Sequence, residues 1–223
     1  MRPFKIAFSG AHSTGKTTAA NALTEGLARH GYKVERAEET ARKCPFPINR
    51  GATPEAQRWI YEATLAAERE AEERAAQSGA EGVICDRTLL DSIVYAFFQS
   101  MSCNRFDKIF PEHREKWRWL YQCDQDFMDS HVFSYDVIWH TKPDGRPPAE
   151  DGVRDTDPDW HAQIAGMFVF FSERLGWHLN KWVFQNTDSY PSLLDVPYVN
   201  HYPGRNQALH LALTLITERK VPA

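Results

Sequence analysis

The sequence has no long hydrophobic run. Its apolar stretches, such as Met167 to Phe171 and Ile93 to Phe98, fall far short of the roughly 18 residues that a membrane-spanning helix needs. The N-terminal region also lacks the apolar stretch of a secretory signal. These absences exclude membrane-spanning classes, so we expect a cytosolic protein with no membrane partner.

Cysteine is scarce, and positive charge is not in excess. Cys44, Cys85, Cys103 and Cys123 form no CxxC pair and have no Cys or His partner at zinc-ligand spacing, so we expect incidental or buried thiols. The formal net charge of -4 argues against a general electrostatic attraction to nucleic acid, although a local basic patch stays open. With 42% hydrophobic residues, no repeat and no low-complexity linker, residues 1–223 read as one globular domain.

Strand-like and helix-like runs alternate along the chain. This order predicts an α/β fold in which a parallel sheet is flanked by helices. Thr53 followed by Pro54 is a typical helix start, and the charged stretch 68–74 inside that helix is expected to face solvent. We expect strands at 4–9, 33–37, 82–85, 135–140 and 196–199, and helices from Gly15 to near Gly31 and at 54–77, 89–98, 112–128, 159–175 and 206–219.

The strongest motif is Gly10-Ala11-His12-Ser13-Thr14-Gly15-Lys16-Thr17, which matches G-x-x-x-x-G-K-[ST] between a predicted strand and a predicted helix. In such a phosphate loop (P-loop), backbone N–H groups surround the phosphates and the lysine reaches the β- and γ-phosphates. The motif predicts that the phosphates of a nucleotide are bound here and that the Thr17 hydroxyl ligates Mg²⁺. The expected nucleotide-binding residues are Gly10, Ser13, Thr14, Gly15, Lys16, Thr17 and Thr18, with Lys16 also catalytic.

Asp86-Arg87-Thr88 follows the predicted strand 82–85. A carboxylate at the carboxyl end of that strand would face the magnesium, and the arginine could hold a phosphate or a substrate oxygen. We therefore interpret Asp86 as a catalytic metal ligand and Arg87 as a catalytic and substrate-binding residue. The alternative is a surface turn with an ion pair.

Glu39 and Arg42 lie just after the second predicted strand, with the spacing of neighbours on one helical turn. Glu39 could accept the proton of an attacking hydroxyl while Arg42 orients the substrate. An exposed salt bridge explains the same spacing equally well, and Glu38 stays open as the working carboxylate. Asp91 is a further candidate for substrate binding, or it stabilises the positive end of its helix.

The segment 144–157 is rich in Pro, Gly, Asp and Arg, which is typical of a surface loop. It contains Arg146 and Arg154. A loop that closes over a nucleotide excludes water, and its arginine can neutralise charge on the transferred phosphoryl group. We interpret this segment as a lid loop with Arg154 as its catalytic residue, although arginines in loops also serve solubility.

Together these motifs resemble those of P-loop kinases related to the nicotinamide riboside kinase domain of bacterial NAD regulators, a group often described only as AAA-type ATPase domains. The order is similar to about residue 160. Beyond it, only the terminal strand and helix around Pro203-Gly204-Arg205 look alike. The motif 86–88 also resembles the acidic-Arg-Ser/Thr motif of deoxynucleoside and thymidylate kinases. The aromatic-rich stretches 117–139 and 177–190 have no assigned counterpart, and we expect acceptor choice to reside there.

The resemblance implies a P-loop NTPase fold of the nucleoside- and thymidylate-kinase type, with ATP and Mg²⁺ as cofactors and a small acceptor. We therefore expect an ATP-dependent kinase that transfers the γ-phosphoryl group to a nucleoside or a nucleotide. A nucleoside hydroxyl would need Glu39, whereas a monophosphate would rely on arginines, and the sequence offers both. Two alternatives stay open. One is a P-loop ATPase or switch that acts on a macromolecular partner. The other is a kinase for a modified base in DNA. Some bacteriophage members of this group resemble kinases for modified pyrimidines.

Overall fold

The computed structural model describes residues 2–102, 111–143, 155–179 and 205–220. Four parallel strands form one sheet in the order β2-β3-β1-β4. The strands are β1 (Phe4–Ser9), β2 (Val34–Ala37), β3 (Gly82–Asp86) and β4 (Val137–His140). This confirms the predicted parallel α/β sheet. The strand expected at 196–199 lies outside the described residues.

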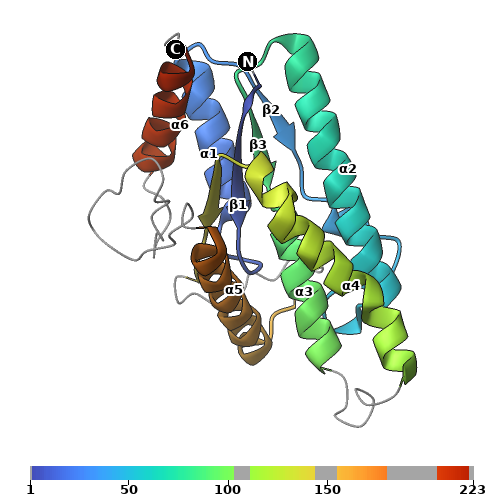
Figure 1. Cartoon of the computed structure of the whole chain (residues 1–223). Helices are drawn as coiled ribbons and strands as arrows, with labels where there is room; N and C mark the ends of the chain where they lie inside the picture. Colours follow the sequence, from blue (N-terminus) through green and yellow to red (C-terminus); the bar gives the residue numbers. More distant parts are fainter. Residues whose placement is uncertain (1, 103–110, 144–154, 180–204, 221–223) are drawn as a thin grey trace.

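Helices cover both faces of the sheet. Figure 1 shows α1 (Lys16–Arg29) beside α6 (Arg205–Lys220) on one side, and α2 (Pro54–Ser78), α3 (Leu89–Ser102) and α4 (Pro111–Asp129) on the other. Helix α5 (Pro158–Leu179) packs against α3. The short 3₁₀ turns are η1 (Ala41–Lys43), η2 (Asn49–Gly51) and η4 (His131–Ser134). Every helix predicted from the sequence is present, although the predicted ends differ by up to four residues.

The start of α2 follows directly from its sequence. Thr53 has an extended backbone, and its hydroxyl accepts a hydrogen bond from the Ala56 N–H at 3.2 Å. Pro54 occupies the first helical position, where its missing N–H costs nothing. At the other end, Gly79 adopts a left-handed conformation with φ of 66°, which glycine tolerates without a Cβ clash. Gln57 and Ile60 in the first turns of α2 line a pocket together with His12.

The charged stretch 68–74 corrects one prediction. It does not face solvent throughout, because Glu68 is only 3% exposed and its carboxylate lies 2.6 Å from the Lys5 ammonium on β1. The hydroxyl of Tyr135 donates to both oxygens of Glu68, at 2.7 and 2.8 Å. Glu72 also binds Lys5, from the half-exposed side. A buried charge is stable only when it is paired and hydrogen-bonded, so this cluster fastens α2 to β1.

The register of the strands determines where the loops meet. Phe8 on β1 pairs with Asp86 on β3, and Ser9 pairs with His140 on β4. Because parallel strands all end at the same edge of the sheet, the loops after β1, β3 and β4 converge there. In the described part of the chain, no helix is long and apolar enough to cross a membrane.

Candidate active site

The phosphate loop connects β1 to α1 at the carboxyl edge of the sheet. Gly10 has φ of 145° and Gly15 has φ of 82°, conformations that residues with a Cβ rarely adopt. A Cβ at Gly10 would also collide with the Thr141 carbonyl. The Thr14 hydroxyl is hydrogen-bonded to the hydroxyl of Thr141 at 2.6 Å. The residue after β4 therefore supports the loop. Both motif glycines are required by the backbone conformation at their positions.

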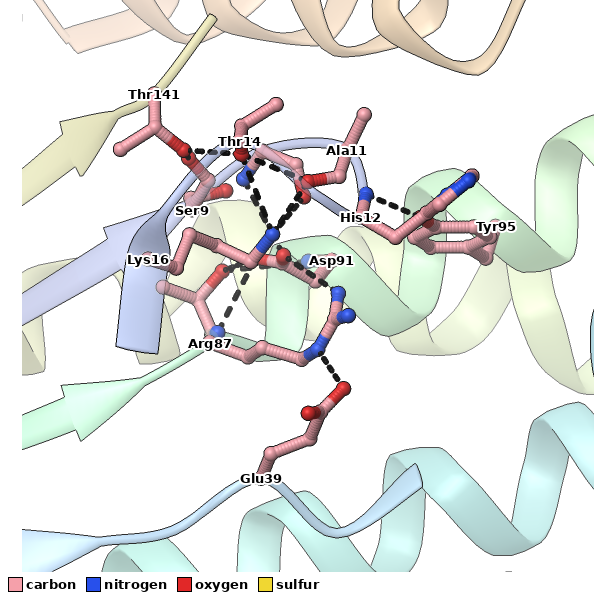
Figure 2. A network of polar contacts seen from close by, with 12 residues as sticks. Ser9, Ala11, His12, Thr14, Lys16, Glu39, Arg87, Asp91, Tyr95 and Thr141 are labelled. Carbon is pink, nitrogen blue, oxygen red and sulfur yellow. Dashed lines mark hydrogen bonds and ion pairs between the residues drawn. The ribbon is translucent and has the colours of Figure 1, made fainter. Parts of the chain in front are cut away.

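Lys16 lies at the centre of this loop (Figure 2). It is 5% exposed, and its ammonium donates to the carbonyls of Gly10, at 2.9 Å, and Ala11. Burial and the nearby charge of Arg87 lower its pKa from the usual 10.5 to about 7. The side chain thus satisfies its donors on the loop itself, at the position where the motif places nucleotide phosphates.

Thr17 and Thr18 lie in the first turn of α1, and Asp86 is the last residue of β3. The two threonines are exposed in the first turn of α1. The Asp86 carboxylate is 3% exposed, and among the described residues its side chain makes no hydrogen bond. Carboxylate and hydroxyl oxygens are ligands of the kind that Mg²⁺ prefers. Because Asp86 is buried, the alternative reading of this motif as a surface turn is wrong for its carboxylate.

The described residues contain no group of three or more His, Cys, Asp or Glu side chains that could hold a metal ion. In kinase sites Mg²⁺ is usually held by one or two carboxylates, the substrate phosphates and water. Thr17 and Asp86 therefore fit the part that a protein contributes.

Arg87 adopts an unusual backbone conformation directly after β3. Its φ is 97°, a region that residues other than glycine rarely occupy, and its N–H donates to the Phe8 carbonyl at 3.1 Å. The guanidinium donates to Glu39 at 2.6 Å and to Asp91 at 3.4 Å (Figure 2). Strained backbone persists where surrounding contacts hold it, and such residues cluster at functional sites. The conformation turns the side chain towards Glu39.

Glu39 is held between two arginines. Its carboxylate contacts Arg87 at 2.6 Å and Arg42 at 3.3 Å. Burial on its own would raise the pKa of Glu39, but the charge and hydrogen bond of Arg87 outweigh it and lower the pKa to about 2. The predicted Glu39–Arg42 pair is present, but Glu39 is only 16% exposed, so this is not the simple surface salt bridge of the alternative reading.

Glu38 lies outside this network. Its side chain is 61% exposed and pairs with Arg36 at 3.4 Å. Of the two neighbouring glutamates, only Glu39 reaches the residues at the end of β3.

Asp91 stabilises the start of its helix, which is one of the two roles predicted for it. It accepts hydrogen bonds from the backbone N–H and the hydroxyl of Thr88, at 3.1 and 2.8 Å, at the start of α3. It also accepts from the Gly10 N–H at 3.3 Å. Asp91 therefore connects the phosphate loop to α3. Substrate binding by Asp91 stays a prediction.

A pocket opens beside the phosphate loop, on the side of Glu39 and Arg87. Several of its residues were not predicted from the sequence. Gln57, in the first turns of α2, is 4% exposed and its amide finds no hydrogen-bond partner within the described ranges. Tyr95 lies one helical turn after Asp91, so the i, i+4 spacing could have indicated it. The pocket is lined by His12, Glu39, Ala41, Arg42, Ile48, Asn49, Gln57, Ile60, Arg87, Asp91, Ser92 and Tyr95.

The lid residues Arg146 and Arg154 lie outside the described residues, as does most of the segment 144–157. The structure brings together the other predicted site residues. They are Gly10, Ser13, Thr14, Gly15, Lys16, Thr17, Thr18, Glu39, Arg42, Asp86, Arg87 and Asp91, all in the loops and helix ends at the carboxyl edge of the sheet or just beyond them.

Comparison with protein families assigns the chain. The sequence model of a protein family described as an AAA domain matches residues 5–181. The chain belongs to this AAA domain family. No curated protein sequence matches it.

Two solved structures share the fold of this chain. A NadR protein in complex with NR has a TM-score of 0.57 and 17% identity over 99% of this chain and 53% of that one. A NadR protein in complex with NAD and AMP-PNP has a TM-score of 0.52 and 18% identity over 99% of this chain and 51% of that one. Deoxyadenosine kinase from M. mycoides with bound dATP matches more weakly, with a TM-score of 0.43 and 13% identity over 96% of this chain and 100% of that one. This chain spans about half the length of the NadR structures. The expected relation to P-loop kinases is confirmed for the fold.

Proposed function

We propose that this protein is an ATP-dependent kinase that transfers the γ-phosphoryl group to a hydroxyl of a nucleoside. One observation carries the proposal. The phosphate loop opens onto a pocket in which a carboxylate, Glu39, is already held by Arg87 at the end of β3. A donor site and an acceptor site that share one wall are what phosphoryl transfer needs.

On the donor side, the loop N–H groups and Lys16 hold the β- and γ-phosphates of ATP. Thr17 and Asp86 hold Mg²⁺, which would neutralise charge on the phosphates when bound. Lys16 exchanges its contacts with the loop carbonyls for phosphate oxygens. The predicted lid arginine, Arg154, belongs to the same proposal.

On the acceptor side, Glu39 accepts a hydrogen bond from the substrate hydroxyl. With its pKa near 2, Glu39 is ionised at neutral pH. A carboxylate of low basicity orients a hydroxyl more than it deprotonates it early, which suits a loose transition state. The hydroxyl oxygen bonds to the γ-phosphorus, the bond from that phosphorus to the β–γ bridging oxygen breaks, ADP leaves, and the hydroxyl proton passes through Glu39 to solvent.

The charges of the pocket favour a nucleoside over a nucleoside monophosphate. Its two arginines, Arg42 and Arg87, are both paired with Glu39, and Arg87 also with Asp91. His12 is neutral at pH 7, because burial lowers its pKa to about 4. The described lining residues therefore carry two positive and two negative charges. A monophosphate would add about two uncompensated negative charges next to Glu39.

Gln57 supports a planar, hydrogen-bonding group at the apolar end of the same pocket. Its buried amide lies with Ile48 and Ile60 in the pocket wall. A primary amide in a pocket wall can donate and accept one hydrogen bond each, so a ligand edge with one acceptor and one donor would pair with it. Nucleobases and carboxamides present such an edge.

Calorimetric titration tests the acceptor class. The protein, saturated with Mg²⁺ and the non-hydrolysable analogue AMP-PNP, is titrated with ribo- and deoxynucleosides, nicotinamide riboside and the matching monophosphates. We expect one nucleoside to bind at least about tenfold more tightly than its monophosphate. Tighter binding of the monophosphate would contradict the nucleoside assignment.

A further inference from the structure

His12 is buried inside the phosphate loop, and neighbouring elements bind both of its ring nitrogens. It is 4% exposed. Nδ1 lies 3.1 Å from the Tyr95 hydroxyl on α3, and Nε2 lies 3.0 Å from the Asp155 carbonyl, which precedes α5. The His12 carbonyl is bound in turn by Nε2 of His161 at 2.8 Å. The side chain thus joins the loop to two separate parts of the fold.

The partners determine the form of the imidazole. A carbonyl only accepts, so Nε2 carries the hydrogen and donates to Asp155. The Tyr95 hydroxyl accepts from the His12 backbone N–H at 2.9 Å, which leaves its own hydrogen to donate to Nδ1 (Figure 2). The neutral ring satisfies every one of these groups. His12 is therefore a hydrogen-bonding connector and not a positive ligand for phosphate.

Both partners of the His12 ring are also tied to the acceptor pocket. The Arg87 guanidinium lies over the Tyr95 ring, 5.8 Å from its centroid, and the same guanidinium binds Glu39. The Asp155 carboxylate is bound by Arg50 at 2.6 Å, and Arg50 belongs to η2 beside the pocket residue Asn49. Two routes of contact therefore run from His12 to the pocket, one along α3 and one through η2.

We propose that His12 is a positioning residue that holds the phosphate loop in register with Arg87 and Glu39. This inference rests on the proposed phosphoryl transfer. In-line transfer needs the γ-phosphorus and the acceptor oxygen in near-attack geometry, and a displacement of about 1 Å can lower the rate by about a hundredfold. Phosphate binding itself depends on Lys16 and the loop N–H groups. The loss of the His12 side chain therefore lowers kcat much more than it weakens ATP binding.

The test compares His12→Ala, His12→Gln and Tyr95→Phe with the wild-type protein, with His30→Ala as the control. His30 is an exposed histidine that binds the Gly26 carbonyl within α1, away from the pocket. For each protein, the Kd of Mg-AMP-PNP is measured by calorimetry, the melting temperature by circular dichroism, and kcat with the nucleoside that the wild type phosphorylates best.

We expect His12→Ala to lower kcat by about tenfold to a hundredfold and to raise the Kd of AMP-PNP by no more than about threefold. His12→Gln regains part of kcat, because its amide can donate to the Asp155 carbonyl. Adding Tyr95→Phe to His12→Ala causes less further loss than Tyr95→Phe does alone, since both act through one contact.

Two results would overturn the positioning role while leaving the kinase assignment intact. One is an unchanged kcat in His12→Ala. The other is a parallel loss of kcat, AMP-PNP affinity and melting temperature that His12→Gln does not relieve, which is the behaviour of a purely structural residue. A wild-type protein that phosphorylates no acceptor would instead overturn the proposed function, and the positioning role with it.

Discussion

Arg87 and Glu39 form a 2.6 Å ion pair across the pocket beside the phosphate loop. The arginine comes from the end of β3 and the glutamate from the segment after β2, so the pair joins two neighbouring strand ends. In the resting protein it neutralises both groups. In phosphoryl transfer the same two side chains would face the acceptor hydroxyl and the transferred phosphoryl group.

Glu39→Gln tests the acceptor side of this pair. The amide keeps the size of the side chain but cannot accept the substrate proton, so we expect kcat to fall by about a hundredfold or more, with the Kd of ATP changed by less than about threefold. Glu38→Gln is the matched control, because Glu38 is exposed and lies outside the network. Equal losses in the two variants, or an effect confined to ATP binding, would remove Glu39 from this role.

Gln57→Leu tests the planar end of the pocket. The change keeps the volume and removes the buried amide, so we expect KM for the nucleoside to rise by about tenfold and kcat to change little. Gln77→Leu, an exposed position on the same helix, is the control. Steady-state kinetics with the preferred nucleoside provide the measurement. If KM stays the same in Gln57→Leu, the amide does not contact the substrate.

Lys16 gives a prediction about protons. Its pKa is about 7 in the nucleotide-free protein, so at pH 8 most molecules hold a neutral amine. Phosphates favour the charged form and raise that pKa, so ATP binding at pH 8 should take up a proton, and less uptake should occur at pH 6, where the amine is already charged. Calorimetry in buffers of different ionisation enthalpy measures this uptake. In Lys16→Ala the uptake and the transfer activity should both disappear. Uptake that persists in Lys16→Ala would assign the proton to another group.

Asp86→Asn tests the magnesium site. Removal of the charge should raise the Mg²⁺ concentration needed for half-maximal ATP binding by about tenfold or more, because the amide is a weaker ligand for this cation. Asp129→Asn changes an exposed aspartate on α4 and serves as the control. A magnesium titration monitored by ATP binding decides the matter. Identical titrations for Asp86→Asn and the wild type would show that Asp86 is not a ligand.

Lys5 and Glu68 give a prediction about stability. Lys5→Met leaves the Glu68 carboxylate buried without its main counter-charge, which should cost about 3–5 kcal/mol in the free energy of unfolding. The double variant Lys5→Met/Glu68→Leu should recover most of this loss, because no uncompensated charge is left. Urea unfolding measures both values. A single variant within about 1 kcal/mol of the wild type would mean that the pair contributes little.

Local patterns predicted most of the fold. The glycine and threonine signals of the phosphate loop and of the start of α2 act within a few residues, so the sequence is sufficient to place them. Glu68 could not be placed in the same way. It lies among charged residues that do face solvent, and only the packing of α2 on β1 brings it next to Lys5. Burial of a single charged residue depends on a partner 63 positions away in the chain.

The site divides in the same manner. Lys16, Asp86 and Arg87 belong to contiguous motifs. Tyr95 could have been found only through its spacing from Asp91, and Gln57 had no signal in the sequence, because the packing of α2 brings it to the pocket. The aromatic-rich stretches 117–139 and 177–190 were expected to select the acceptor, and most of the second lies outside the described residues. The pocket beside Glu39 is lined by no residue of 117–139, and Trp117 and Trp139 are buried in the core instead. Aromatic residues stabilise cores as readily as they bind planar ligands, so composition alone cannot distinguish the two.

We propose that this AAA domain protein transfers phosphoryl groups to nucleosides. The most direct measurement incubates it with γ-labelled ATP and Mg²⁺ and a panel of ribo- and deoxynucleosides, nicotinamide riboside, the nucleoside monophosphates, and single- and double-stranded DNA. We expect label on one nucleoside, none on DNA, and none in the Lys16→Ala variant. Label on DNA alone, or slow ATP hydrolysis without any labelled acceptor, would contradict it.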